Sequence, residues 1–198
     1  ENIMPLGANK AAIMGVAGVS TGDVVLISSQ TASNSASLTF SSGISSTYGE
    51  YIFKFYNINP ATESVNLTFQ ANAVDASGYN ETLTSTFFRA KHDEADSTTS
   101  VAYIAGADQA QGTAFQQLAY SIDDDADASA NGELHLFNPS STTYVKHWLS
   151  RFSLQDQTPM EMDQYAAGYF NITTAIDDVQ FKMSSGNFDG KIKMWGVK

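Results

Sequence analysis

The densest group of residues that could do chemistry is the acidic run Asp123-Asp124-Asp125-Ala126-Asp127. The aspartates at its first, third and fifth positions match the opening of a calcium-binding loop, in which carboxylate oxygens hold the ion. The rest of that loop does not match, because position six is Ala128 instead of glycine and position twelve is Leu134 instead of glutamate. A calcium site of another kind stays open, but the sequence favours a solvated acidic turn between two strands.

A second acidic patch, His92-Asp93-Glu94-Ala95-Asp96, could supply two carboxylates to a glycosidase, which needs them about 5–10 Å apart. Nothing in the sequence pairs either carboxylate with an apolar pocket, so we expect an ordinary acidic loop. The histidines His92, His135 and His147 show no metal-ligand spacing, and we interpret them as packed or surface imidazoles. The chain has no cysteine, and no phosphate or dinucleotide motif is present. We therefore predict no catalytic, metal or cofactor-binding residue, no cofactor and no enzymatic activity.

Aromatic side chains offer a different chemistry, because their flat faces stack on the C–H groups of sugars. Six of them lie in the C-terminal third: Tyr144, Trp148, Phe152, Tyr165, Tyr169 and Trp195. They could form a sugar-binding platform. The even spacing of Trp148 and Phe152 favours a place in the core, and Trp195 shares a face with Lys193, as expected at a rim or interface.

The elements that position these residues follow a two-residue period. Tyr51, Phe53 and Phe55 share one face of a run, and Val65, Leu67 and Phe69 alternate with polar residues in the next. About ten short runs of this kind, separated by turn-forming residues, predict an all-β fold. We expect an antiparallel β-sandwich that is jelly-roll-like, with polar linkers that include residues 28–37 and 92–100. The turn 184–190 is rich in residues that tolerate positive φ, so the last two runs are predicted to form a hairpin.

Composition separates the first 23 residues from the rest. Residues 1–23 are rich in Gly and Ala, and they hold these larger apolar side chains: Ile3, Met4, Leu6, Ile13, Met14, Val16 and Val19. We consider a flexible leader, or an extended arm that orders against a neighbouring subunit, followed by one β-sandwich domain at 24–198. No transmembrane or signal segment stands out, and a net charge of −11 argues against nucleic acid and anionic membranes as partners.

The C-terminal third carries a more specific pattern. It contains Gly168-Tyr169-Phe170-Asn171-Ile172-Thr173-Thr174, then Phe181-Lys182-Met183-Ser184-Ser185-Gly186-Asn187-Phe188-Asp189-Gly190, and ends in Lys191-Ile192-Lys193-Met194-Trp195-Gly196-Val197. With Phe55 to Thr62 and Gly132 to Ser140, this pattern resembles virion structural proteins of tailed bacteriophages, especially phages of marine bacteria such as cyanobacteria. The resemblance covers roughly residues 50–198 and includes no catalytic residue.

The resemblance implies a non-enzymatic component of a virion, either a capsid decoration protein or a tail or fibre protein. We then expect a homo-oligomer, with a trimer favoured, that docks on other virion proteins of the capsid or tail and is located on the extracellular particle. The alternative is a carbohydrate-binding, lectin-like module that recognises glycans of a host, and a polysaccharide-degrading enzyme comes third.

Overall fold

The computed structural model describes residues 23–198, which form twelve β-strands and contain no helix that could cross a membrane. The predicted arm lies outside these residues apart from Asp23. The strands are β1 (Val24–Ser35), β2 (Leu38–Phe40), β3 (Glu50–Pro60), β4 (Val65–Ala73), β5 (Leu83–Asp93), β6 (Thr99–Tyr103), β7 (Gln116–Ile122), β8 (Ala130–Phe137), β9 (Lys146–Asp156), β10 (Met160–Phe170), β11 (Ile176–Met183) and β12 (Phe188–Val197).

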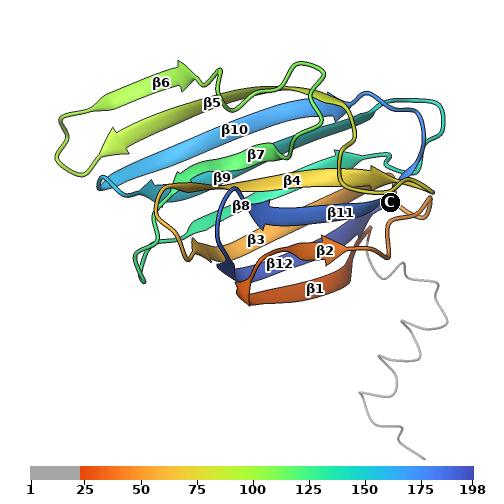
Figure 1. Cartoon of the computed structure of the whole chain (residues 1–198), viewed down its shortest axis with the longest axis horizontal. Coiled ribbons are helices and arrows are strands. Elements are labelled where there is room, and N and C mark those ends of the chain that lie inside the picture. Colours follow the sequence, from red (N-terminus) through yellow and green to blue (C-terminus); the bar gives the residue numbers. More distant parts are fainter. Residues whose placement is uncertain (1–22) are drawn as a thin grey trace, which may run out of the picture.

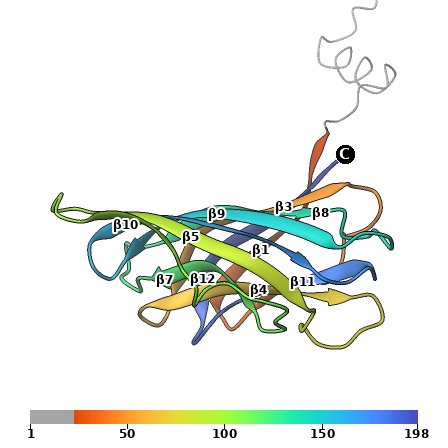
Figure 2. The same ribbon diagram turned by 90° about the horizontal axis from the view of Figure 1, so that it is seen from above.

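The strands form two antiparallel sheets that pack face to face, as Figures 1 and 2 show. The larger sheet has eight strands in the order β1-β12-β3-β8-β9-β10-β5-β6, and the smaller has four in the order β2-β11-β4-β7. The predicted antiparallel β-sandwich is thereby confirmed, whereas its jelly-roll connectivity stays a prediction. Consecutive strands stay in one sheet only at β5–β6, β8–β9 and β9–β10; every other connection in the described chain crosses between the sheets.

The predicted hairpin at the C-terminal end is wrong, because β11 lies in the small sheet and β12 in the large one. The turn 184–190 does contain the expected left-handed glycines, Gly186 with φ of 73° and Gly190 with φ of 136°. Such residues permit any tight change of direction. They do not decide whether the next strand pairs beside the previous one or packs above it.

Phe181 of β11 is the centre of the core between the sheets. Its ring centroid lies 5.1 Å from that of Phe55, 5.2 Å from Phe53, 6.0 Å from Phe40 and 6.3 Å from Phe69. Phe53 and Phe55 come from the large sheet, so the ring of Phe181 fastens the two layers together. The apolar faces that alternation predicted for these strands are confirmed, since the side chains concerned are almost fully buried.

Two glycines within strands make room for the largest core side chains. Gly132 lies opposite Phe152 and Gly168 lies opposite Trp148, in neighbouring strands. A Cβ atom at Gly132 would lie 2.6 Å from the Phe152 ring, and one at Gly168 would lie 2.7 Å from the Trp148 ring. Each aromatic ring therefore covers a strand position that only glycine can fill.

Where linkers were predicted, one strand and the second part of another were missed, since only residues 24–27 of β1 were expected to be a strand. β1 continues to Ser35 through a run of Ser, Thr and Asn, and β6 begins at Thr99. Both are edge strands of the large sheet, and all five residues of β6 are exposed. A strand that buries few side chains leaves no apolar alternation in the sequence, so its pairing with β12 or β5 could not be detected in that way.

Candidate functional site

The outer faces of the two sheets differ in chemistry. On the four-stranded sheet, the side chains that point away from the core are polar, as at Thr39, Asn66, Asn72, Gln180 and Lys182. On the eight-stranded sheet, several exposed side chains are large and apolar: Val24, Leu26, Phe88, Val101, Tyr103 and Leu149. Apolar side chains that gather on one exposed face mark a surface for association. The outer face of the large sheet is therefore the candidate functional site.

The centre of this surface is a row of side chains in register across neighbouring strands, which we call the apolar row. It consists of Leu26, Trp195, Ile52, His135, Leu149 and Ala167, each paired with the next across the sheet from β1 to β10. Leu26 is 45% exposed and Leu149 is 44% exposed. Alternation fixes which side chains share a face, but the register that joins these six came from the structure.

At one end of the apolar row the surface is hollowed into a groove of about 390 Å³, the apolar groove. Leu149, Phe137 and Tyr169 form its sides, and the small residues Ala167 and Gly168 lie at its base. Small side chains between large ones create the depression. A volume of this size falls within the range of sites that enclose a small ligand or several side chains of a partner.

Aromatic rings extend the surface toward β6. Phe88 and Tyr165 are cross-strand partners whose rings stack with centroids 4.9 Å apart at an angle of 7°. Tyr103 pairs with Phe88 on the other side and is 54% exposed. The guanidinium carbon of Arg151 lies 5.2 Å from the Tyr165 ring centroid, a cation–π contact. These rings are held in place by their neighbours and present rigid apolar area.

Next to the apolar row, a second groove of about 500 Å³ is lined by polar and charged side chains; we call it the polar groove. Arg151 donates two hydrogen bonds to Asp163, of 2.9 and 2.7 Å, and the Tyr165 hydroxyl donates a third, of 2.7 Å. The hydrogen bonds from Arg151 are the main reason that the pKa of Asp163 lies below its usual range. Ser153 donates to Glu161 at 2.8 Å. The groove thus presents fixed donors and acceptors.

Charge is nearly balanced on the outer face of the large sheet, although the chain as a whole carries −11. The basic side chains on this face are Lys54, Arg151, Lys191 and Lys193, and the acidic ones are Glu50, Glu133, Glu161, Asp163 and Asp189. Several form ion pairs, such as Lys54 with Glu133 at 3.5 Å. Most of the acidic excess therefore lies elsewhere, and a partner of low net charge meets little electrostatic repulsion at this face.

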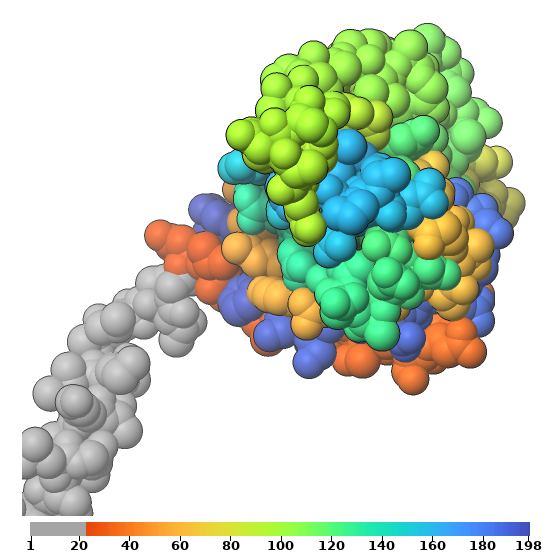
Figure 3. Space-filling view, turned by 90° about the vertical axis from the view of Figure 1, so that its left-hand side faces the viewer, coloured from red at the N-terminus to blue at the C-terminus, as the bar shows by residue number. Residues whose placement is uncertain are grey.

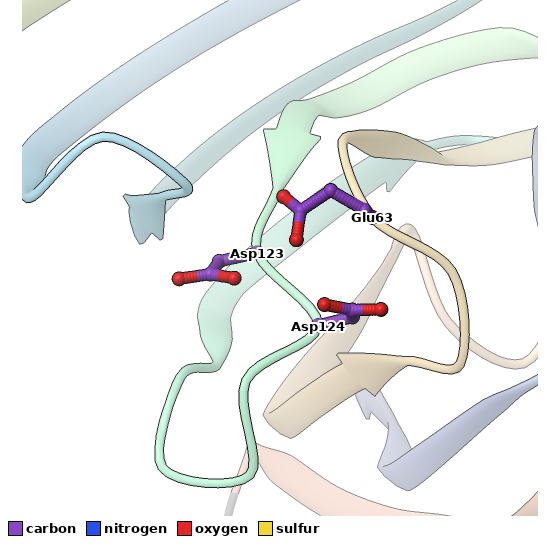
Figure 4. Close-up of side chains that lie close together, drawn as sticks. All are labelled: Glu63, Asp123 and Asp124. Atoms are coloured by element: carbon purple, nitrogen blue, oxygen red, sulfur yellow. The ribbon is translucent and has the colours of Figure 1, made fainter.

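Much of the acidic excess lies at one end of the sandwich, where the loops around residues 93–98, 123–129 and 157–159 meet (Figure 3). Figure 4 shows two aspartates of this end, Asp123 and Asp124, together with Glu63, and carboxylate oxygens of the three lie within 4.8 Å of one another. A hydrogen bond with Asp124 is the main reason that the pKa of Glu63 is raised. Of the aspartates expected from the calcium-loop pattern, Asp125 and Asp127 are exposed and lie outside this group, and Glu63 comes from the β3–β4 loop, far away in sequence.

The second acidic patch forms the turn between β5 and β6. Asp93 accepts hydrogen bonds from the backbone N–H groups of Ser97 and Thr98, both at 2.8 Å, and from the Ser97 hydroxyl. These hydrogen bonds, with that of the Ser97 hydroxyl the largest cause, lower the pKa of Asp93 to about 2. Asp93 therefore stabilises the turn as a carboxylate, while His92 Nε2 lies 3.2 Å from Asp96.

The structure divides the six aromatic residues of the proposed sugar platform among three places. Trp148 and Phe152 are in the core, as their spacing favoured. Tyr165, Tyr169 and Trp195 lie on the outer face of the large sheet, and Tyr144 is 71% exposed in the β8–β9 loop. His135 and His147 also lie on the outer face, where His135 is flanked by Glu50 and, at 3.4 Å, by Glu133. The six do not form one platform.

The loops at the other end of the sandwich are tied together by a buried lysine. The Lys146 ammonium donates hydrogen bonds to the backbone carbonyls of Tyr144, Ile172 and Thr173, at 2.7, 3.3 and 3.2 Å. Burial lowers the pKa of Lys146. Since the first carbonyl belongs to the β8–β9 loop and the others to the β10–β11 loop, Lys146 fixes both loops next to the apolar groove.

Comparisons with models of protein families, with curated proteins and with solved structures found no match to this chain.

Proposed function

We propose that this protein is a non-enzymatic structural component of a tailed-phage virion, a capsid decoration or a tail or fibre protein, that self-assembles and docks on the particle. The observation that carries the proposal is the apolar row on the outer face of the large sheet. The sequence resemblance to virion proteins is a second, separate line of support. Phe181, Ile192 and Met194 are buried, and the turn between them crosses from one sheet to the other. That pattern accordingly describes how the sandwich is built.

The size of the outer face suits association between copies. Eight strands at about 4.8 Å spacing and about seven residues at 3.4 Å each give an area of about 900 Å² per copy. Stable interfaces bury about 800 Å² on each partner. Because the face carries nearly balanced charge, the acidic excess does little to oppose contact there, while the acidic end repels other copies. The proposed assembly is a homo-oligomer, a trimer, located on the extracellular particle.

A pair of matched substitutions tests this role of the apolar row. Leu149→Lys places a charge in the row at a side chain that is 44% exposed, and Val74→Lys makes a comparable change at one that is 39% exposed and follows β4. We expect both variants to keep the wild-type melting temperature, and only Leu149→Lys to lower the assembled fraction in light scattering. Equal assembly of the two variants contradicts the proposal.

The position on a particle is tested separately. Mass spectrometry of virus-sized particles purified from the source of the sequence should detect this chain in many copies per particle. Its presence only in the fraction that contains free protein contradicts a place on the virion, even if the chain self-assembles.

A second candidate function, recognition of neutral glycans, is favoured by the polar groove. Tyr56 is 39% exposed at its edge, and Asn131, Arg151 and Ser153 offer hydrogen-bonding groups inside it. An exposed ring beside fixed donors and acceptors suits the two chemistries of a sugar, its C–H faces and its hydroxyl groups. A glycan array with wild type and Tyr56→Ala tests it: binding that Tyr56→Ala removes supports this function, and no binding by the wild type contradicts it.

A further inference from the structure

The apolar row is partly or fully exposed in the described chain, and the residues that precede β1 are rich in apolar side chains. Of the 22 residues before Asp23, seven are larger apolar residues and only Glu1 and Lys10 are charged, with opposite signs. Burying the apolar side chains of such a segment against another apolar surface lowers the free energy. The segment and the row therefore have matching chemistry.

The segment before Asp23 and the apolar row are also compatible in charge. The acidic excess is concentrated in the loops at one end of the sandwich, whereas the row and its flanks carry nearly equal numbers of basic and acidic groups. A segment with no net charge and many small residues meets no electrostatic cost there. The small side chains at the base of the apolar groove leave room for one or two larger ones, and the groove of about 390 Å³ is open to the outside.

The described chain begins at an edge of the large sheet, because β1 is the outermost strand there. The carbonyl of Asp23 accepts a hydrogen bond of 2.9 Å from the backbone N–H of Lys198, next to the pairing of Val24 with Val197. Asp23 thus continues the β1–β12 ladder by one residue beyond both strands. The segment before Asp23 is therefore attached at a corner of the sheet, where a neighbouring copy can approach.

Length permits a contact with a neighbouring copy. The distance across the sheet from β1 to β10 is about 24 Å, at about 4.8 Å for each strand interval. A chain of 22 residues can extend over about 70 Å at about 3.3 Å per residue. The segment can leave its own sheet and still cross the apolar row of another copy.

We propose that residues 3–19 of one copy dock on the apolar row and in the apolar groove of a neighbouring copy, so that each chain covers the exposed face of the next. This inference rests on the proposed self-assembly and names its contact. A head-to-tail contact of this kind closes into a ring when the rotation between copies allows it, as in a trimer.

Disulfide trapping in the full chain tests the contact, because the protein has no cysteine of its own. Val16→Cys and Leu6→Cys are prepared as separate chains, and each is mixed with Ala167→Cys under mild oxidation. Ala126→Cys, an exposed position in the acidic loop, is the matched control. We expect a disulfide-linked dimer of two different chains with Ala167→Cys, formed at least ten times faster than with Ala126→Cys.

Three results would overturn the inference. Equal trapping at Ala167→Cys and Ala126→Cys, in a wild-type chain that light scattering shows to be oligomeric, removes the proposed contact and leaves the proposed function in place. A doubly substituted chain, Val16→Cys with Ala167→Cys, that forms its disulfide within one molecule at high dilution places the segment on its own sheet. A wild-type chain that stays at 21.3 kDa contradicts the proposed self-assembly itself.

Discussion

The ring of Phe181 should contribute more to stability than any exposed ring of the same kind. Phe181→Ala removes a buried side chain that touches four other rings from both sheets. Replacing a buried phenylalanine by alanine lowers the free energy of unfolding by about 3–5 kcal/mol. Because Phe181→Ala also removes four aromatic pairs, we expect a loss in the upper part of that range. Since whole domains of this size are stable by about 5–15 kcal/mol, the variant should be close to unfolding.

The matched control is Phe88→Ala, which removes the same ring from the outer face. Phe88 is 43% exposed and stacks on Tyr165 alone, so we expect a loss of about 1 kcal/mol. Urea unfolding followed by tryptophan fluorescence gives the free energy of unfolding for both variants. Equal losses for the two would refute the view that Phe181 fastens the sheets together.

Three further predictions concern the sheets, the acidic end and the buried lysine. Gly168→Ala should lower the free energy of unfolding by about 2 kcal/mol or more, because the new Cβ would meet the Trp148 ring and the Thr84 carbonyl. The control Ala167→Gly should lower it by less than about 1 kcal/mol. If Gly168→Ala leaves the free energy of unfolding in urea unchanged, this packing is wrong. Glu63→Gln should raise the melting temperature at pH 7. Because the pKa of Glu63 is raised in the folded protein, chiefly by the hydrogen bond with Asp124, its contribution to stability is lost as the pH rises. The gain from Glu63→Gln should therefore shrink as the pH falls into the acidic range, and a gain that is the same at every pH contradicts the role of this carboxyl. Lys146→Met should lower the free energy of unfolding by about 1–3 kcal/mol, because three backbone carbonyls lose their hydrogen-bond donor. The same substitution should speed amide hydrogen exchange in the β8–β9 and β10–β11 loops. Unchanged exchange in these loops contradicts the role of Lys146.

Alternation in the sequence predicted the core better than it predicted the topology. Phe53, Phe55 and Phe69 were expected on inward faces and are buried. The crossing from β11 to β12 was not predicted, because turn residues report local backbone freedom and not the sheet to which the next strand belongs. β6 escaped detection for another reason: an edge strand exposed on both faces has no buried side chains to mark its period.

The candidate site shows a similar division. Ile52 and Leu149 are apolar residues at outward positions of strands whose other outward side chains are mostly polar or charged, and only the register places the two in one row. Trp195 lies on the outer face, and its expected place at a rim or interface stays a prediction. The approach of Glu63 to Asp123 could not be predicted, since they are distant in sequence and meet only through the packing of two loops.

The central claim is that copies of this chain associate through the outer face of the large sheet. The most direct test is the molar mass of the full chain by light scattering over a range of concentrations. The account predicts a mass of three times 21.3 kDa that falls when Leu149 is replaced by lysine. A constant mass of 21.3 kDa at every concentration would contradict it.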